Sequence, residues 1–376
     1  MMFELIIAGF AILLLAVFIK NSRLGHGSLP PGPTPLPIIG HFHLLGPLIH
    51  HSFRDLCSSY GPLIYLRLGS VPCVVASTPE LAKELLKTND LTFSSRKHSL
   101  AIDHLTYSSS FAFSPYGPYW RFIKKMSTFE FLGNRALNQF LPVRRKELHQ
   151  FLGVLHDKSK VCDSVNVTEE LLKLSSNIIS QIILSLRCSG TDNEAEGVRT
   201  LVREVTQMFG EFNVSDFFWF CRNLDFQGYR KKFEDVHRRY DALLEKIITN
   251  REIERKNKIS TGGEYKARDL LDMMLDALED KSSEVELTRE HIKALVLDFI
   301  TAATDTTASA TEWALAELIN NPKCFEWNVV DSGAVKIKGN AAHPVDMTER
   351  PGLTAPRFHE LVCAPVPRPA LDSLQL

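Results

Sequence analysis

A short polar run lies inside a long, mostly apolar helical pattern between residues 288 and 320. It reads Ala302-Ala303-Thr304-Asp305-Thr306-Thr307 and combines small, hydroxyl and carboxyl side chains. Thr and Asp are mediocre helix formers, so their presence inside a helix indicates a role other than helix formation. A threonine hydroxyl can bond the carbonyl one turn back, and paired alanines leave a bare surface for a flat ligand. A hydroxyl beside a carboxyl group can also relay protons. A stripe packed against neighbouring helices is the alternative, and the helical pattern alone favours it.

A second candidate for chemistry is the aromatic and basic stretch at residues 116–125. Trp120 and Lys124 are one helical turn apart and therefore share a face. An indole N–H beside an ammonium group can bind a carboxylate or a phosphate. A Trp–Lys pair on a surface is common, so this pair is a weak signal when taken alone.

The elements that must position these residues are mainly helical. Two short β-branched runs, 63–68 and 72–76, are joined by Gly69-Ser70 and predict a hairpin. Thr78 and Pro79 then supply the cap and first residue of a helix. The fold class is therefore mainly α with a small N-terminal β element. Further helices are expected over residues 121–132, 138–158, 168–186, 194–212, 229–258, 267–279 and 288–320.

Composition excludes several classes of protein. The 376 residues contain 43 Lys and Arg against 44 Asp and Glu, and this balance argues against a nucleic-acid binder. A hydrophobic content of 44% is ordinary for a globular protein. The seven cysteines are odd in number and widely spaced, with no C-x-x-C, which excludes a disulfide framework or zinc module and fits a reducing compartment.

The N-terminus predicts a membrane anchor. Residues 1–19 are apolar apart from Glu4, and such a helix is roughly 28 Å long, enough to span a bilayer core. A cleaved signal peptide is the alternative. Lys20 and Arg23 follow the apolar run, so we expect the rest of the chain to face the cytosol. Residues 21–40 are rich in proline and are expected to form a stiff hinge, or a mere spacer.

In this order, the anchor, the hinge, Trp120-Arg121-x-x-Lys124-Lys125 and the polar run at 302–307 resemble the plant microsomal cytochromes P-450, which are haem-thiolate monooxygenases. The resemblance covers residues 1–323 and is closest to flavone synthase II. It implies a single transmembrane helix at 1–20, a hinge at 21–40, and an incomplete cytochrome P-450 fold, its N-terminal two-thirds, at 41–323. The closer match lies in residues 46–50, 68–77, 92–98, 110–120 and 297–322.

The resemblance also implies roles for individual residues. Trp120 and Lys124, with Arg121 nearby, bind a haem propionate, and Ala302 and Ala303 lie over the haem face. Many relatives have glycine at the second of these alanines. Asp305 and Thr306 deliver protons to the dioxygen that is being activated. The substrate pocket is implied to include Ser99, Ile102, Phe111, Phe113, Leu297, Phe299 and Ile300.

The implied reaction is oxidation of a flavanone to a flavone. It uses dioxygen and electrons that NADPH supplies through NADPH-cytochrome P-450 reductase, at the endoplasmic reticulum membrane. A flavanone 2-hydroxylase or another flavonoid hydroxylase is the alternative, because desaturation and hydroxylation begin with the same hydrogen abstraction. They diverge by small differences in substrate placement.

After residue 323 the resemblance stops. Residues 324–376 contain six prolines and no amphipathic period, so we expect a divergent, disordered tail that arose by frameshift, intron retention or splicing. The family's F-x-x-G-x-R-x-C-x-G loop is not found. Two sequences with E-x-x-R spacing, at 196–199 and 252–255, precede the long helix and are therefore in the wrong order for the family's E-x-x-R helix. Cys363 lacks that context, so no metal ligand is expected. We therefore expect this chain to be inactive: a truncated non-catalytic membrane protein, or an interaction protein that uses its tail.

Overall fold

The computed structural model describes residues 29–188, 193–261, 269–280, 284–321, 336–337 and 344–366. The expected anchor at 1–20 and the first part of the hinge lie outside these residues. Among the described helices, none is long and apolar enough to cross a membrane. The chain divides into two compact units. The first unit is Met1–Ser95 with Phe212–Arg230, and the second is Arg96–Glu211 with Lys231–Leu376.

The first unit contains the predicted hairpin. Strands β1 (Leu63–Leu68) and β2 (Val71–Ala76) pair antiparallel, with Leu66 opposite Cys73. Helix α2 (Ile49–Tyr60) packs on the hairpin through an apolar core of Cys57, Ile64 and Leu66. The predicted helix cap is also confirmed, because the Thr78 hydroxyl accepts the Leu81 N–H at the start of α3 (Pro79–Lys83). This unit also contains the short helices α4 (Asp90–Phe93) and α11 (Val214–Phe217), the 3-10 helices η1 (Phe42–Leu44) and η4 (Trp219–Cys221), and the π-helix η2 (Glu84–Thr88).

The described part of the proline-rich hinge packs along β1. The Tyr65 N–H donates to the Pro31 carbonyl at 2.9 Å. His41 is 1% exposed, and its ring accepts the Arg67 N–H at 2.7 Å while Nε2 contacts the Pro33 carbonyl at 2.8 Å. A Cβ at Gly32 would lie 2.2 Å from the Tyr65 oxygen, so only glycine fits there. This segment is therefore part of the first unit rather than a free spacer.

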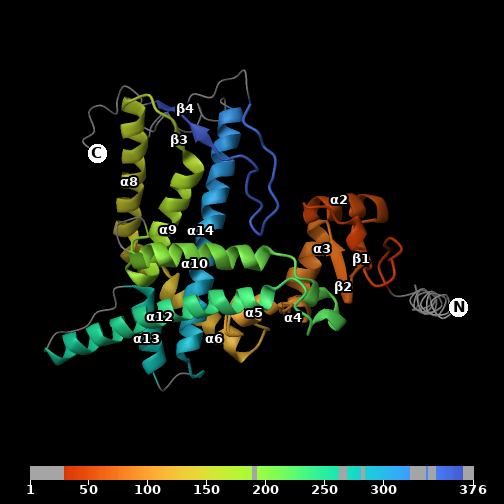
Figure 1. The fold of residues 1–376 in the computed structure, drawn as a ribbon, viewed down its shortest axis with the longest axis horizontal. Coiled ribbons are helices and arrows are strands. Elements are labelled where there is room, and N and C mark those ends of the chain that lie inside the picture. Colours follow the sequence, from red (N-terminus) through yellow and green to blue (C-terminus); the bar gives the residue numbers. More distant parts are fainter. Residues whose placement is uncertain are drawn as a thin grey trace. The chain divides into compact units, whose positions relative to one another are not determined.

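Three long helices lie side by side in the second unit (Figure 1). Helix α9 (Val167–Leu184) packs against both α8 (Leu141–Lys160) and α14 (Arg289–Asn320). Residues 292–298 of α14 are all buried, and the apolar residues 294–297 among them lie in the core of this unit. The other helices are α5 (Leu100–Leu105), α6 (Pro118–Met126), α7 (Asn134–Gln139), α10 (Asn193–Gly210), α12 (Tyr229–Ser260) and α13 (Leu270–Glu279).

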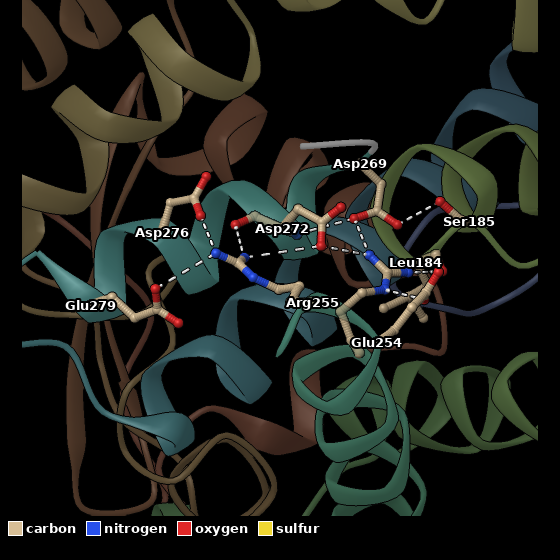
Figure 2. Close-up of polar contacts among 9 residues, drawn as sticks. Leu184, Ser185, Glu254, Arg255, Asp269, Asp272, Asp276 and Glu279 are labelled. Carbon is tan, nitrogen blue, oxygen red and sulfur yellow. Dashed lines mark hydrogen bonds and ion pairs between the residues drawn. The ribbon is translucent and has the colours of Figure 1, made fainter. Parts of the chain in front are cut away.

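An ion network joins α12 to α13, and one of its members belongs to an E-x-x-R sequence of α12 (Figure 2). Arg255 binds the carboxylate of Asp276 and lies 3.6 Å from that of Glu279. The glutamate of the same sequence, Glu252, binds Arg289 at 2.6 Å. Both ends of this E-x-x-R sequence therefore connect α12 to other elements of the second unit.

Residues 336–337 and 344–366 have a defined place in the second unit, which differs from the disorder that the sequence predicted for them. Strand β5 (Val362–Cys363) pairs with β3 (Val165–Asn166), and β6 (Pro365–Val366) pairs with β4 (Lys336–Ile337). Leu361 is 3% exposed and joins an apolar cluster with residues of β3, α9 and α14. The order comes from contacts with distant parts of the chain, which no local period reveals.

A buried ion pair fixes this segment to α14. Arg357 lies 3.3 Å from Glu312, and the two side chains are 2% and 5% exposed. Arg357 also donates to the Asp346 carbonyl at 2.7 Å. The Trp313 indole N–H donates to the Ala355 carbonyl at 3.2 Å. Residues 344–366 therefore stabilise the C-terminal half of α14.

Candidate functional site

Helix α14 presents two different faces around the polar run. Ala302, Thr306, Thr307, Ala310 and Ala314 are exposed, and we call them the open face. Asp298, Thr304, Ala308 and Glu312 are buried at helical spacing on another side, and we call them the packed face. The stripe packed against neighbouring helices is thus real, but it occupies one side of the helix only.

The hydroxyl group of Thr306 on the open face and that of the neighbouring Thr311, which is also exposed, are bonded to their own helix. Thr306 Oγ1 donates to the Ala302 carbonyl at 2.5 Å, as the sequence predicted, and Thr311 donates to the Thr307 carbonyl at 2.8 Å. The oxygen lone pairs of Thr306 are left to accept a further proton donor. The open face is therefore small, bare and able to accept hydrogen bonds.

Asp305 lies at a cavity of about 260 Å³ between α9, α10 and α14. Thr304 and Ile300 also line this cavity, as do Arg199 and Arg203 of α10. Burial raises the pKa of the Asp305 carboxyl, and the nearby Arg203 charge opposes that shift. The predicted proton-relay pair is consequently divided, because Asp305 lines the cavity whereas Thr306 lies on the open face.

Trp120 and Lys124 lie together on α6, and Phe111 completes the group. The Phe111 and Trp120 rings stack with centroids 6.0 Å apart and planes 28° apart. Lys124 Nζ lies 6.0 Å from the Phe111 ring centroid. Lys124 and Arg121 are exposed and Trp120 is half-buried. An indole N–H and a cation are therefore held on one face, as predicted, where they can bind a carboxylate.

The other predicted pocket residues of α14 are not all on one side. Phe299 is half-buried and meets Phe131 edge to face at 5.9 Å. Leu297 is 0% exposed and Ile300 is 3% exposed. The structure therefore brings Phe299 nearest to solvent, while Leu297 is a core residue and Ile300 lines the Asp305 cavity.

The remaining predicted pocket residues belong to the loop before α6 and to α5. Ser99 caps α5, since its hydroxyl accepts the Ile102 N–H at 3.2 Å. Ile102 is buried at 9% exposure. Phe113 meets Phe209 of α10 edge to face at 5.9 Å. These side chains support the loop rather than form one cluster with the open face.

Two residues that support α14 were missed by the sequence reasoning. The Ser175 hydroxyl of α9 lies 3.0 Å from the Ala303 carbonyl and 2.9 Å from the Thr304 carbonyl. Asp298 accepts hydrogen bonds from the loop at 110–112. A carboxylate within a fully buried apolar run was a signal for Asp298, whereas no sequence signal distinguished Ser175.

The open face offers a bare surface for a flat ring, and the α6 group offers an N–H and a cation for a carboxylate, whereas the described cysteines of the second unit lie elsewhere. Cys363 belongs to the apolar cluster that contains Ala308 of the packed face. Cys188 lines the Asp305 cavity, and Cys162 follows α8, which α9 separates from α14. Cys324 is outside the described residues. The donor set therefore suits haem on one side only, and no described cysteine of the second unit lies at the open face to bind its iron.

These features define a mainly α protein with a long helix suited to lie against a flat cofactor. The sequence matches the family model of cytochrome P450 over residues 30–326. The chain belongs to the cytochrome P450 family.

Three relatives place the chain within the plant members of this family. It is 62% identical over 301 residues to cytochrome P450 93B2 of Gerbera hybrida and 58% identical over 322 residues to cytochrome P450 93B16 of Glycine max. These matches cover 80% and 84% of the chain, but only 58% and 61% of the two relatives. The chain therefore spans about three-fifths of the length of these relatives.

The 2-hydroxyisoflavanone synthase of Glycyrrhiza echinata is 40% identical over 354 residues, with 92% of the chain and 66% of that relative covered. The covered 92% of the chain is longer than residues 1–323. The aligned region therefore reaches past residue 323, whereas the match to the family model ends at residue 326, close to the expected boundary.

Proposed function

We propose that this chain carries the distal side of a flavonoid monooxygenase site, the side on which dioxygen and substrate meet the haem. The observation that carries the proposal is the open face, where small side chains surround a threonine bonded to the Ala302 carbonyl. Family membership supports haem as the cofactor. Two relatives are named 2-hydroxyisoflavanone synthase and 3,9-dihydroxypterocarpan 6A-monooxygenase, which supports a flavonoid as the substrate class.

The more specific reaction that we propose for the complete site, of which this chain carries one side, is that of flavone synthase II, conversion of a flavanone to a flavone. NADPH supplies the electrons through its cytochrome P-450 reductase, and residues 1–20 attach the chain to the endoplasmic reticulum membrane. The flavanone 2-hydroxylase alternative stays open, because a relative named for a 2-hydroxylated product is 40% identical to this chain.

In this proposal each described residue has a limited task. Haem, when bound, supplies the iron at which dioxygen is reduced. Trp120 and Lys124 bind a haem carboxylate, and Ala302 leaves room for the ring. Thr306 accepts and passes a proton through its hydroxyl. Burial raises the pKa of Asp305, so its carboxyl group holds a proton nearer to neutral pH than an exposed one and exchanges it through the cavity.

The proposal assigns no axial ligand to the described cysteines. Thiolate coordination provides the electron donation that favours O–O cleavage in this family. We therefore expect the chain to bind a haem-like ring weakly and to form no flavone from a flavanone in the presence of the reductase and NADPH. Flavone formation by this chain would contradict that expectation.

A haem titration of the membrane-bound chain tests the open face. We expect Ala302→Trp to weaken binding by about ten-fold or more, since an indole on this face occupies the place of the ring. Ala242→Trp is the matched control, because Ala242 is an exposed alanine of α12. Equal binding by both variants would remove the open face from the proposal.

A further inference from the structure

The loop between α5 and α6 is attached to α14 through one buried carboxylate. Asp298 Oδ1 accepts the Ser110 hydroxyl at 2.6 Å, and Oδ2 accepts the Phe111 N–H at 2.7 Å. The Ala112 backbone N–H also bonds this carboxylate. Asp298 itself is only 7% exposed. Three consecutive loop residues therefore share a single acceptor.

The loop is shaped so that its donors converge on Asp298. The Ser114 N–H donates to the Ser110 carbonyl at 2.9 Å, which closes one helical turn. The N–H groups at the start of such a turn have no partner within it. In most helices a cap residue of the same segment accepts them. Here the cap comes from a different helix, 187 residues further along the chain from Phe111.

The other end of the loop is held by a different carboxylate. The Tyr107 hydroxyl donates to Asp241 of α12 at 2.7 Å, and Lys293 of α14 binds the same carboxylate at 2.6 Å. Asp241 thus has a cation beside it, whereas the contacts of Asp298 come from neutral donors. The two attachments can be removed one at a time.

Asp298 is also the attachment nearest to the proposed site. It precedes Ala302 by four residues and so lies one turn earlier on α14, where the packed face borders the open face. The Phe111 ring that follows the bonded N–H stacks on Trp120 and faces Lys124. A shift of the loop backbone would therefore move Phe111 against the pair that is proposed to bind the haem carboxylate.

We propose that Asp298 is a positioning residue that caps the 110–114 turn from α14 and thereby fixes Phe111 against Trp120 at the edge of the site. The attachment of the loop follows from the described contacts alone. Its importance for ligand binding rests on the proposed function.

Burying a charged carboxylate at position 298 is unfavourable in free energy, which argues that Asp298 does more than fill space in the core. Burial raises the pKa of Asp298 to about 6, although the three donors oppose that shift. The titratable groups that face it are Tyr119 of α6 and Tyr240 of α12, and both keep their protons at neutral pH because burial raises their pKa as well. A neutral side chain of the same size would avoid the cost of burial but could not accept all three bonds.

Hydrogen exchange of the whole chain tests the attachment without reference to activity. We expect Asp298→Asn to speed exchange of the Phe111 and Ala112 amides by about ten-fold or more, because these amides lose an ionised acceptor. The matched control is Asp241→Asn, which should loosen the Tyr107 end and leave Phe111 and Ala112 unchanged. Amides of α8 report whether either variant unfolds globally.

Ser110→Ala keeps the inference testable if Asp298→Asn fails to fold. This variant removes one donor and keeps the carboxylate, so we expect a smaller increase in exchange, about three-fold, at the same two amides. Unchanged exchange at residues 111 and 112 in both variants would overturn the inference.

Binding measurements with haem and a flavanone on the same variants separate this inference from the proposed function. We expect Asp298→Asn to weaken binding of haem and of a flavanone, while Asp241→Asn weakens it less. If Asp298→Asn speeds exchange of the loop amides but even the wild-type chain binds neither ligand, the proposed function is refuted and the attachment of the loop to Asp298 is retained. Faster exchange with wild-type affinity in Asp298→Asn would overturn the positioning role.

Discussion

The open face and the packed face belong to the same helix but satisfy their polar groups in opposite ways. On the open face, the Thr306 hydroxyl bonds a carbonyl four residues back. On the packed face, Asp298 and Glu312 bond Ser110 and Thr168, which lie 188 and 144 residues earlier in the chain. Local bonds leave the open face free for a ligand, whereas distant bonds make the packed face part of the core.

Because of this difference, we expect substitutions on the packed face to change stability and substitutions on the open face to change ligand binding. Replacing a packed-face residue should change the free energy of unfolding, because a buried partner elsewhere in the unit loses its bond. Replacing an open-face residue should change ligand binding and leave that free energy almost unchanged. Substitutions at the ion pair, Asp298, Ser175 and the open-face threonines test whether stability and binding depend on different faces of α14.

The largest effect is expected at the ion pair between Glu312 and Arg357. Glu312→Ala leaves the Arg357 charge buried without its carboxylate, at a cost of about 3–5 kcal/mol in the free energy of unfolding. Denaturant unfolding followed by circular dichroism measures this cost. The double variant Glu312→Leu with Arg357→Met is the control and should lie close to wild type. A loss below about 1 kcal/mol in Glu312→Ala would show that residues 344–366 are not bound as described.

A pH dependence is expected from Asp298. Its pKa is raised from 3.8 to about 6 by burial, so the folded state binds the proton more tightly than the unfolded state. The free energy of unfolding should therefore be highest below pH 4 and fall as pH rises toward 6, relative to Asp298→Asn. Unfolding of both proteins across this range measures the difference. A wild-type chain that gains stability over Asp298→Asn with rising pH would contradict the burial of this carboxylate.

A smaller effect is expected at Ser175. Its hydroxyl contacts the Ala303 and Thr304 carbonyls from α9, so Ser175→Ala should lower the free energy of unfolding by about 1 kcal/mol. Because these carbonyls lie beside the open face, haem titration of the same variant tells whether support from α9 matters for binding. A variant as stable as wild type would mean that the bond adds nothing to the fold.

The smallest effect on stability is expected on the open face. Thr306→Ala and Thr307→Ala should each change the free energy of unfolding by less than about 0.5 kcal/mol, since both side chains are exposed. Thermal unfolding checks this. A loss of several kcal/mol in either variant would place that threonine in the core and end the distinction between the two faces.

The same contrast explains what the sequence could predict. The hairpin, the cap at Thr78, the helix that ends at Asn320 and the bond from Thr306 to Ala302 all depend on neighbouring residues, so local patterns identified them. The order of residues 344–366 and the role of Asp298 depend on partners more than 40 residues away. No local period carries such information, which is why the tail was expected to be disordered.

The most direct test of the account is the reduced carbon-monoxide difference spectrum of the membrane-bound chain supplied with haem. We predict a haem band without the strong red shift of thiolate ligation, lost in Ala302→Trp and retained in Cys363→Ser. A strongly red-shifted band that disappears in Cys363→Ser would place the ligand with the packed face and contradict the account. No haem band at all would show that the open face does not bind the ring.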